Sequence, residues 1–307
     1  MTERPPETVP MCYRHPTRET WVRCTRCDRP ICPDCMREAA VGFQCPECVA
    51  EGRRTQRPAR TAFGGSDAGR FGYVTKALIA LNVLAFVASV ASAGSADAVA
   101  GGTGFGGLLG SSTPLTDWGG ILGRAIFQGE TEISGIAEGE YYRLITAMFL
   151  HYGILHLLMN MWALFVLGRD LEAALGPVRF AALYLLAGLG GNVAVYALTL
   201  PNAPPTAGAS TAVFGLFAAL FVLLRRLRRD TSAIVPILVI NLIFTFTVPR
   251  ISIQGHIGGL VAGAVVAAIL AYAPPRRRTL VQAVGLSAVL ALFLLLVISR
   301  TVAILGA

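Results

Sequence analysis

The chain contains seven long apolar stretches, and each approaches or exceeds the ~20 residues that an α-helix needs to cross a hydrocarbon core. They cover residues 72–93, 148–168, 178–199, 208–224, 231–248, 251–273 and 279–303. With 307 residues that are 54% hydrophobic, the chain is too apolar for a water-soluble protein of this size. The predicted fold class is therefore an all-α polytopic membrane protein with seven spans.

The positive charges indicate which way these spans run. Arginines gather before residue 71, at residues 225–229 and at residues 276–278, and they all fall on one side if the amino terminus is cytoplasmic. The opposite side receives the acidic, glycine-rich loop 94–142 and the uncharged loop 200–207. We predict a multi-pass protein of the cell membrane, with a cytoplasmic amino terminus and an extracytoplasmic carboxyl terminus. The net charge of +8 then reflects membrane topology, and no nucleic-acid partner is expected.

All seven cysteines lie before residue 50, and a histidine completes four pairs that each have a two-residue gap. The pairs are Cys12 with His15, Cys24 with Cys27, Cys32 with Cys35, and Cys45 with Cys48. These ligands suffice for two tetrahedral zinc ions, whereas an odd cysteine count in a reducing compartment argues against disulfides. Interleaved pairs, first with third and second with fourth, would form a cross-brace. Sequential pairing is the alternative.

Residues 1–50 have few large apolar side chains, so we expect the two zinc ions to be structural and needed for folding. The segment resembles a small zinc finger of the B-box type. That resemblance implies a structural or protein-binding role, with a cytoplasmic protein as an expected partner. Residues 51–70 are basic and contain proline and glycine, which predicts a flexible linker before a membrane domain at residues 71–303.

Four polar residues fall at similar shallow depths in spans that are entered from the outer side. Ser210 lies near the start of 208–224, and His256 near the start of 251–273. His156 and Asn160 lie one helical turn apart in the second stretch. A lone serine in a membrane helix usually bonds its own backbone or a neighbouring helix. Four such residues at one depth indicate a functional site.

The chemistry available to these groups is acyl transfer. The hydroxyl of Ser210 needs a base, and His256 can supply it, in a dyad that lacks a carboxylate. The backbone N–H of Ser210, the amide of Asn160 and the ring of His156 can donate to an oxyanion. No cofactor is needed for this chemistry.

Two further patterns support a close approach of the fourth and sixth spans. Gly255, Gly259 and Gly263 form a smooth stripe that begins beside His256. Phe214, one turn after the serine, is expected to pack under the imidazole.

These residues resemble the rhomboid family of intramembrane serine proteases, over about residues 72–303. The matching motifs are Gly208-Ala209-Ser210-Thr211, Gly255-His256-Ile257-Gly258-Gly259, His151 with His156 and Asn160, Tyr142-Arg143, and Gly168-Arg169-x2-Glu172. The resemblance implies a six-helix core plus one extra carboxyl-terminal helix. It also implies Ser210 as nucleophile, His256 as base, and an oxyanion hole of His156, Asn160 and Ser210. The expected substrates are single-span membrane proteins, cut near the extracytoplasmic ends of their transmembrane helices.

Two departures from the family pattern bear on activity. Thr211 stands where the family has glycine, and Tyr142 where it has tryptophan. We expect the branched side chain of Thr211 to lie next to the oxyanion site, where it would either alter backbone freedom or narrow the pocket. The alternatives are a non-catalytic rhomboid-like binder of membrane segments, and a transporter or channel with a regulatory zinc domain. The lack of charged residues deep in the spans disfavours ion transport.

Overall fold

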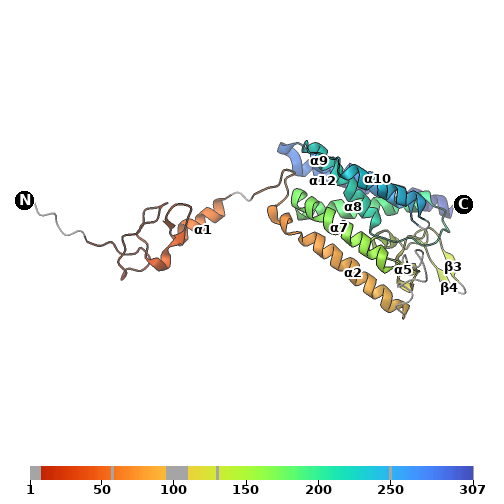
Figure 1. Ribbon diagram of the computed structural model, residues 1–307, viewed down its shortest axis with the longest axis horizontal. Coiled ribbons are helices and arrows are strands. Elements are labelled where there is room, and N and C mark those ends of the chain that lie inside the picture. The colour runs from red at the N-terminus through yellow and green to blue at the C-terminus, as the bar shows by residue number, and fades with distance from the viewer. Residues whose placement is uncertain (1–7, 57–58, 95–109, 129–130, 249–250, 307) are drawn as a thin grey trace, which may run out of the picture. The chain divides into compact units, whose positions relative to one another are not determined.

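The computed structural model describes residues 8–56, 59–94, 110–128, 131–248 and 251–306 (Figure 1). The chain divides into two compact units, Met1–Ala59 and Arg60–Ala307.

The amino-terminal unit is built from short pieces around buried cysteines. It contains a 3-10 turn at Pro33–Cys35, a two-stranded hairpin of β1 (Arg37–Glu38) and β2 (Phe43–Gln44), and helix α1 (Pro46–Thr55). Its buried cluster consists of six cysteines and Ile31, which is the one buried aliphatic residue there among the described positions. A core this small cannot offset the conformational entropy of folding without further cross-links.

The second unit is a bundle of helices, and each predicted apolar stretch overlaps one of them (Figure 1). They are α2 (Tyr73–Ala93), α7 (Ile154–Leu175), α8 (Pro177–Leu198), α9 (Ser210–Arg226), α10 (Ile234–Thr247), α11 (Ile253–Tyr272) and α12 (Arg278–Leu305). Five helical segments in the described residues are long and apolar enough to cross a membrane: α2, α7, α8, α11 and Pro275–Leu305. The chain is thus a mostly helical polytopic membrane protein, while α9 with 17 residues and α10 with 14 are shorter.

The second apolar stretch was predicted at 148–168, but its helix is displaced toward the carboxyl end. Residues Ala147–Phe149 form a 3-10 turn, and α7 begins at Ile154 after the extended Gly153. It ends at Leu175, where Gly176 adopts a φ of +79°. Hydropathy cannot separate an apolar turn from an apolar helix, which is why the predicted boundary was wrong. The displacement leaves His151 outside the helix.

Helix α11 packs closely against both α9 and α8 at glycines. A Cβ at Gly259 would overlap the carbonyl oxygen of Thr211, and one at Gly263 would overlap the backbone of Gly215. On the other side, a Cβ at Gly190 of α8 would overlap the methyl group of Ala262. The predicted small-residue stripe is confirmed, and it lets backbones approach where lipid gives no hydrophobic drive for association.

Residues 51–70 were predicted to be a flexible linker, but some of the described residues in this range form helices. Helix α1 continues to Thr55, and residues Asp67–Phe71 form a 3-10 helix. Gly65 lies so close to the end of α7 that a Cβ there would overlap the carbonyl oxygen of Leu175. Residues 57–58 of the predicted linker lie outside the described part. Glycine therefore serves packing here, rather than flexibility alone.

Glu172, in the predicted Gly-Arg-x2-Glu motif, ties α7 to the start of α2. Its fully buried carboxylate accepts hydrogen bonds from the backbone N–H of Val74 at 3.0 Å and of Thr75 at 2.8 Å, and from the Thr75 hydroxyl at 2.8 Å. First-turn N–H groups have no intrahelical partner and carry positive partial charge. The buried carboxylate satisfies them.

The loop between α2 and α7 holds more structure than the sequence predicted. It contains α5 (Pro114–Gly119), a hairpin of β3 (Ile126–Gln128) and β4 (Thr131–Ile133), and α6 (Arg143–Thr146). Arg143 is 1% exposed and binds several segments of this loop at once. It donates to the carbonyl oxygens of Asp117, Gly120 and Ser134 and to the carboxylate of Glu140.

The last helix, α12, is joined to α8 by polar contacts. Arg300 donates to the carbonyl oxygen of Thr199 at 3.0 Å, and the hydroxyls of Tyr196 and Thr301 lie 2.7 Å apart. The Arg300 bond caps the carboxyl-terminal end of α8, where the last carbonyl groups lack helical partners.

The contact of α11 with α9 predicts a large effect of one added side chain. Replacing Gly263 with valine should lower stability by at least about 1–3 kcal/mol, because the new Cβ meets backbone that cannot rotate away. Unfolding followed in detergent micelles measures this. The exposed Val265 of the same helix, changed to leucine, is the control and should unfold like the wild type. Equal stability of both variants would contradict the observed packing.

Candidate active site and metal centres

Ser210 is the first residue of α9, and the preceding turn places it beside α7. Gly208 in that turn has a φ of +152° and donates its N–H to the carbonyl oxygen of Ala147 at 2.9 Å. A Cβ at Gly208 would lie 2.9 Å from the Nε2 of His156 and 3.3 Å from the Oγ of Ser210. Only glycine fits there, and its missing side chain leaves the serine and the histidine facing one small space.

The hydroxyl of Ser210 and the imidazole of His256 are in hydrogen-bond contact. The Oγ–Nε2 distance is 2.9 Å, and His256 is 7% exposed near the start of α11. The side chain of Ser252 accepts from the Gly255 N–H at 3.1 Å and so caps this helix. The contact depends on the glycine packing of α11 against α9.

The ring of Phe214 fixes the plane of the imidazole. The two ring centroids are 4.0 Å apart and the planes are inclined by 18°. The packing expected from the one-turn spacing after Ser210 is confirmed. A stacked ring restricts rotation about the last side-chain bond of His256.

The second nitrogen of His256 has a partner that sequence reasoning missed. Its Nδ1 lies 2.7 Å from the Oγ1 of Thr245, a residue of α10 that is 2% exposed. The sequence held one usable signal, a threonine near the outer end of the span that precedes His256. Threonines are so common in membrane helices that this signal is weak.

Of the predicted oxyanion donors, His156 borders the space at Gly208 beside Ser210, and Asn160 follows one turn later in α7. The ring of His156 is held between His151, whose ring centroid is 5.0 Å away, and Tyr152, at 6.5 Å. Asn160 donates to the carbonyl oxygen of His156 at 2.8 Å, so this hydrogen bond runs along its own helix and leaves one amide hydrogen for another acceptor.

The start of α9 adds backbone donors next to the serine. Ala209, which precedes the helix, makes no side-chain capping bond. The N–H groups of the first turn therefore have no intrahelical partner, and the helix dipole favours negative charge at this end. An anion forming beside Ser210 would meet these groups.

The expectation that Thr211 narrows the oxyanion site is wrong. Its Cβ lies 2.6 Å from where a Gly191 side chain would start, and its Cγ2 lies 3.0 Å from the equivalent point on Gly255. The side chain thus fills the contact between α8 and α11. Its buried hydroxyl has no hydrogen-bond partner among the described residues.

In the amino-terminal unit, the eight predicted ligands form two groups whose ligand atoms all lie within 4.8 Å of one another. The groups are Cys12, His15, Cys32 and Cys35, and Cys24, Cys27, Cys45 and Cys48. This grouping is the interleaved one, first pair with third and second with fourth. Each group could hold a metal ion.

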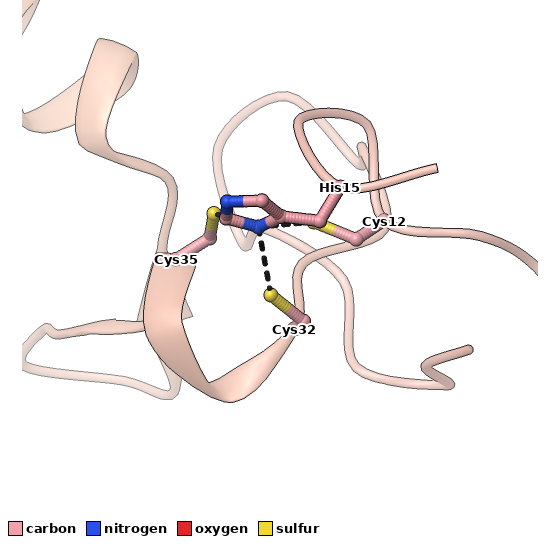
Figure 2. A group of neighbouring side chains, drawn as sticks. All are labelled: Cys12, His15, Cys32 and Cys35. Atoms are coloured by element: carbon pink, nitrogen blue, oxygen red, sulfur yellow. Dashed lines mark hydrogen bonds between the residues drawn. The ribbon is translucent and has the colours of Figure 1, made fainter. Parts of the chain in front are cut away.

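The first group surrounds a histidine nitrogen with three sulfur atoms (Figure 2). The Nδ1 of His15 is 3.8 Å from the Sγ of Cys12, 3.2 Å from that of Cys32 and 3.4 Å from that of Cys35. Tetrahedral ligands at about 2.0–2.3 Å from a zinc ion are separated by about 3.5–3.8 Å. The donor set and its spacing therefore fit such an ion.

One thiol of each group is disposed to ionise, because the pKa values of Cys12 and Cys24 are lowered to about 6, whereas burial raises the pKa of Cys35 to about 11 and that of Cys48 to about 12. Burial raises the pKa of the Cys12 thiol, but backbone hydrogen bonds, the largest of them from Cys32, lower it to about 6. Metal ligation requires the thiolate form.

The family model of the rhomboid domain matches residues 138–273. The chain is 44% identical over 147 residues to "Rhomboid protease GluP" of Bacillus subtilis (strain 168), covering 46% of this chain and 28% of that protein. It is 37% identical over 134 residues to "Putative rhomboid protease YdcA" of the same organism, covering 42% of this chain and 67% of that protein.

The chain belongs to the rhomboid family. One relative is named as inactive: the chain is 38% identical over 130 residues to "Inactive rhomboid protein 1" of Papio anubis. That match covers 40% of this chain and 15% of the relative. The matched rhomboid region spans only 28% of GluP, so the whole-protein activity of that relative does not transfer by alignment alone.

The position of Thr211 predicts that this departure from the rhomboid pattern leaves the reactivity of Ser210 intact. Thr211→Val keeps the shape and removes a buried hydroxyl that lacks a partner. It should leave stability unchanged or raise it by up to about 1 kcal/mol. Labelling of Ser210 by a fluorophosphonate should proceed at the wild-type rate. A marked loss of labelling in a folded variant would show that the hydroxyl acts at the site.

Proposed function

We propose that this rhomboid-family chain is an intramembrane serine endopeptidase with Ser210 as nucleophile and His256 as general base. The 2.9 Å contact between Ser210 Oγ and His256 Nε2 carries the proposal. Stacking on Phe214 at 4.0 Å and the unpaired first turn of α9 support it.

In the proposed reaction, His256 Nε2 takes the hydroxyl proton as Ser210 Oγ attacks the carbonyl carbon of the scissile bond. The carbonyl oxygen becomes negative and accepts hydrogen bonds from the Ser210 N–H, His156 and Asn160. His256 then gives the proton to the leaving amine, and an acyl-enzyme remains. Water, deprotonated by His256, releases the acid and restores the serine.

The proposed substrates are single-span membrane proteins cut near the extracytoplasmic ends of their transmembrane helices. Ser210, His156 and His256 all lie within the first turn of their helices, which places the site at one side of the bundle. The positive charge of the loops on the other side supports a site at the outer face of the cell membrane and an amino terminus in the cytoplasm. In this proposal α9 and α10 also span, which gives a six-helix core followed by α12.

A second candidate function is non-catalytic binding of membrane segments. The 38% identity to an inactive rhomboid protein favours considering it. The presence of a serine, a stacked histidine and a neighbouring histidine around one space favours the protease.

Cleavage of a model transmembrane substrate in proteoliposomes distinguishes these functions. Ser210→Ala and His256→Ala should each lower the cleavage rate by at least about 10³-fold, since either change removes the nucleophile or its activation. Ser299→Ala, an exposed serine of α12, is the control and should cleave normally. Binding of the substrate without cleavage by the wild type would favour the non-catalytic function.

For the amino-terminal unit we propose a B-box-type zinc finger with two structural zinc ions in the interleaved arrangement. Each ion would be held by one of the two four-residue groups, which close the chain onto itself where an apolar core is lacking. The unit would face the cytoplasm and offer a docking site for a cytoplasmic protein.

Metal analysis of the full chain tests this proposal. The wild type should retain two zinc ions per chain, one for each group. Cys35→Ser should lose at least one of them, because a tetrahedral site with three ligands binds far more weakly. Val41→Ser, at an exposed position of the same unit, is the matched control. Full zinc content in the Cys35 variant would rule out this ligand set.

A further inference from the structure

We propose that Thr245 is a positioning residue that holds His256 in the tautomer able to accept a proton from Ser210. The inference rests on the proposed protease function, but it makes a structural claim that can be tested apart from cleavage. In this arrangement the neutral hydroxyl of Thr245, from a third helix, takes the role of the carboxylate that the predicted dyad lacks.

The contacts form a continuous series from α9 to α10. Ser210 Oγ lies 2.9 Å from His256 Nε2, and His256 Nδ1 lies 2.7 Å from Thr245 Oγ1. The Thr245 hydroxyl also lies 2.8 Å from the carbonyl oxygen of Asn241, one turn earlier in α10. Thr245 is 2% exposed, so its hydroxyl is shielded from solvent by its neighbours.

The number of protons available sets the direction of each bond. The carbonyl oxygen of Asn241 can only accept, so the single proton of the Thr245 hydroxyl points to it. The same oxygen then accepts from His256, which requires the proton of the neutral imidazole to be on Nδ1. Nε2 is left with a lone pair directed at the Ser210 hydroxyl, as a general base requires.

No other described contact of the imidazole selects between its two neutral forms. Phe214 stacks on the ring face, and stacking is indifferent to which nitrogen carries the proton. With Nδ1 unprotonated, Nε2–H would donate to the serine oxygen and could not take its proton. The Thr245 hydroxyl is therefore the group that sets the tautomer.

A threonine that bonds the carbonyl one turn earlier is common in helices and often means nothing more. Thr247 of the same helix does this, with its hydroxyl 2.8 Å from the carbonyl oxygen of Ile243. Thr245 differs because it has a second partner in another helix. Among the hydrogen bonds of the described residues of α10, the one from Thr245 reaches α11. Thr247 thus offers a control within the same helix.

The kinetic test compares Thr245→Val, Thr245→Ser and Thr247→Val in proteoliposomes. Thr245→Val should lower kcat about 10- to 100-fold with KM within about twofold, because the charge-assisted bond to His256 strengthens as the ring gains a proton. Thr245→Ser keeps the hydroxyl and should stay within about threefold of the wild type, as should Thr247→Val. Loss of activity in the serine variant equal to that in the valine variant would overturn the proposal.

A spectroscopic test reads the tautomer directly. The chain has four histidines, so ¹⁵N-histidine labelling gives few ring signals, and His256→Asn assigns the one of interest. In the wild type, His256 should show a protonated Nδ1 and an unprotonated Nε2. Thr245→Val should move it toward the opposite form or a mixture. An unchanged Nδ1–H signal in this variant would overturn the proposal.

The two readouts separate this inference from the proposed function. A wild type that cleaves nothing but shows the Thr245-dependent tautomer would remove the protease function and leave the Thr245 assignment standing. A wild type that cleaves the substrate, with identical kcat in both Thr245 variants, would support the protease function and remove the Thr245 assignment. If Thr245→Val fails to fold in micelles, Thr245→Ala supplies the same loss of the acceptor with less bulk, and the same outcomes apply.

Discussion

The backbone contact of α11 with α9 is the constraint on which the membrane unit depends. At Gly259 and Gly263 the two helices meet without intervening side chains, and this separation brings His256 to Ser210. In a bilayer such packing must supply the free energy of helix association that hydrophobic burial supplies in water, because lipid tails are as apolar as the helices. The same glycines that stabilise the bundle therefore set the distance between Ser210 Oγ and His256 Nε2.

Two buried charges organise the segments at either end of this bundle. Arg143 binds four oxygen atoms of the α2–α7 loop, and Glu172 binds three donors at the start of α2. Each charge is matched mainly by backbone groups, whose own hydrogen bonds would otherwise be unmet. Removal of either side chain would leave several such groups unpaired at once, so both act on whole segments.

Hydropathy and charge predicted the helices, and depth along each helix predicted which polar residues could meet. What the sequence could not give was the rotation of each helix and the neighbours of each side chain. Thr211 was therefore assigned to the wrong surroundings, and Thr245 was missed. The start of α7 and the order within 51–70 depend on turns and close packing that apolar composition does not reveal. The interleaved cysteine grouping was one of two open alternatives.

If the proposed zinc binding holds, the interleaved ligand groups have a consequence for how the amino-terminal unit would acquire its metal ions. Closing the group that contains Cys12 and Cys35 encloses Cys24 and Cys27 in the same loop, and this loop then leads directly to Cys45. Binding of the first ion would lower the entropy cost of assembling the second ligand group, since part of the loop-closure entropy of its ligands has already been lost. Metal binding should accordingly be cooperative, so that chains with one ion are scarce at equilibrium. A chelator that removes part of the metal should then leave some chains with both ions and others with neither.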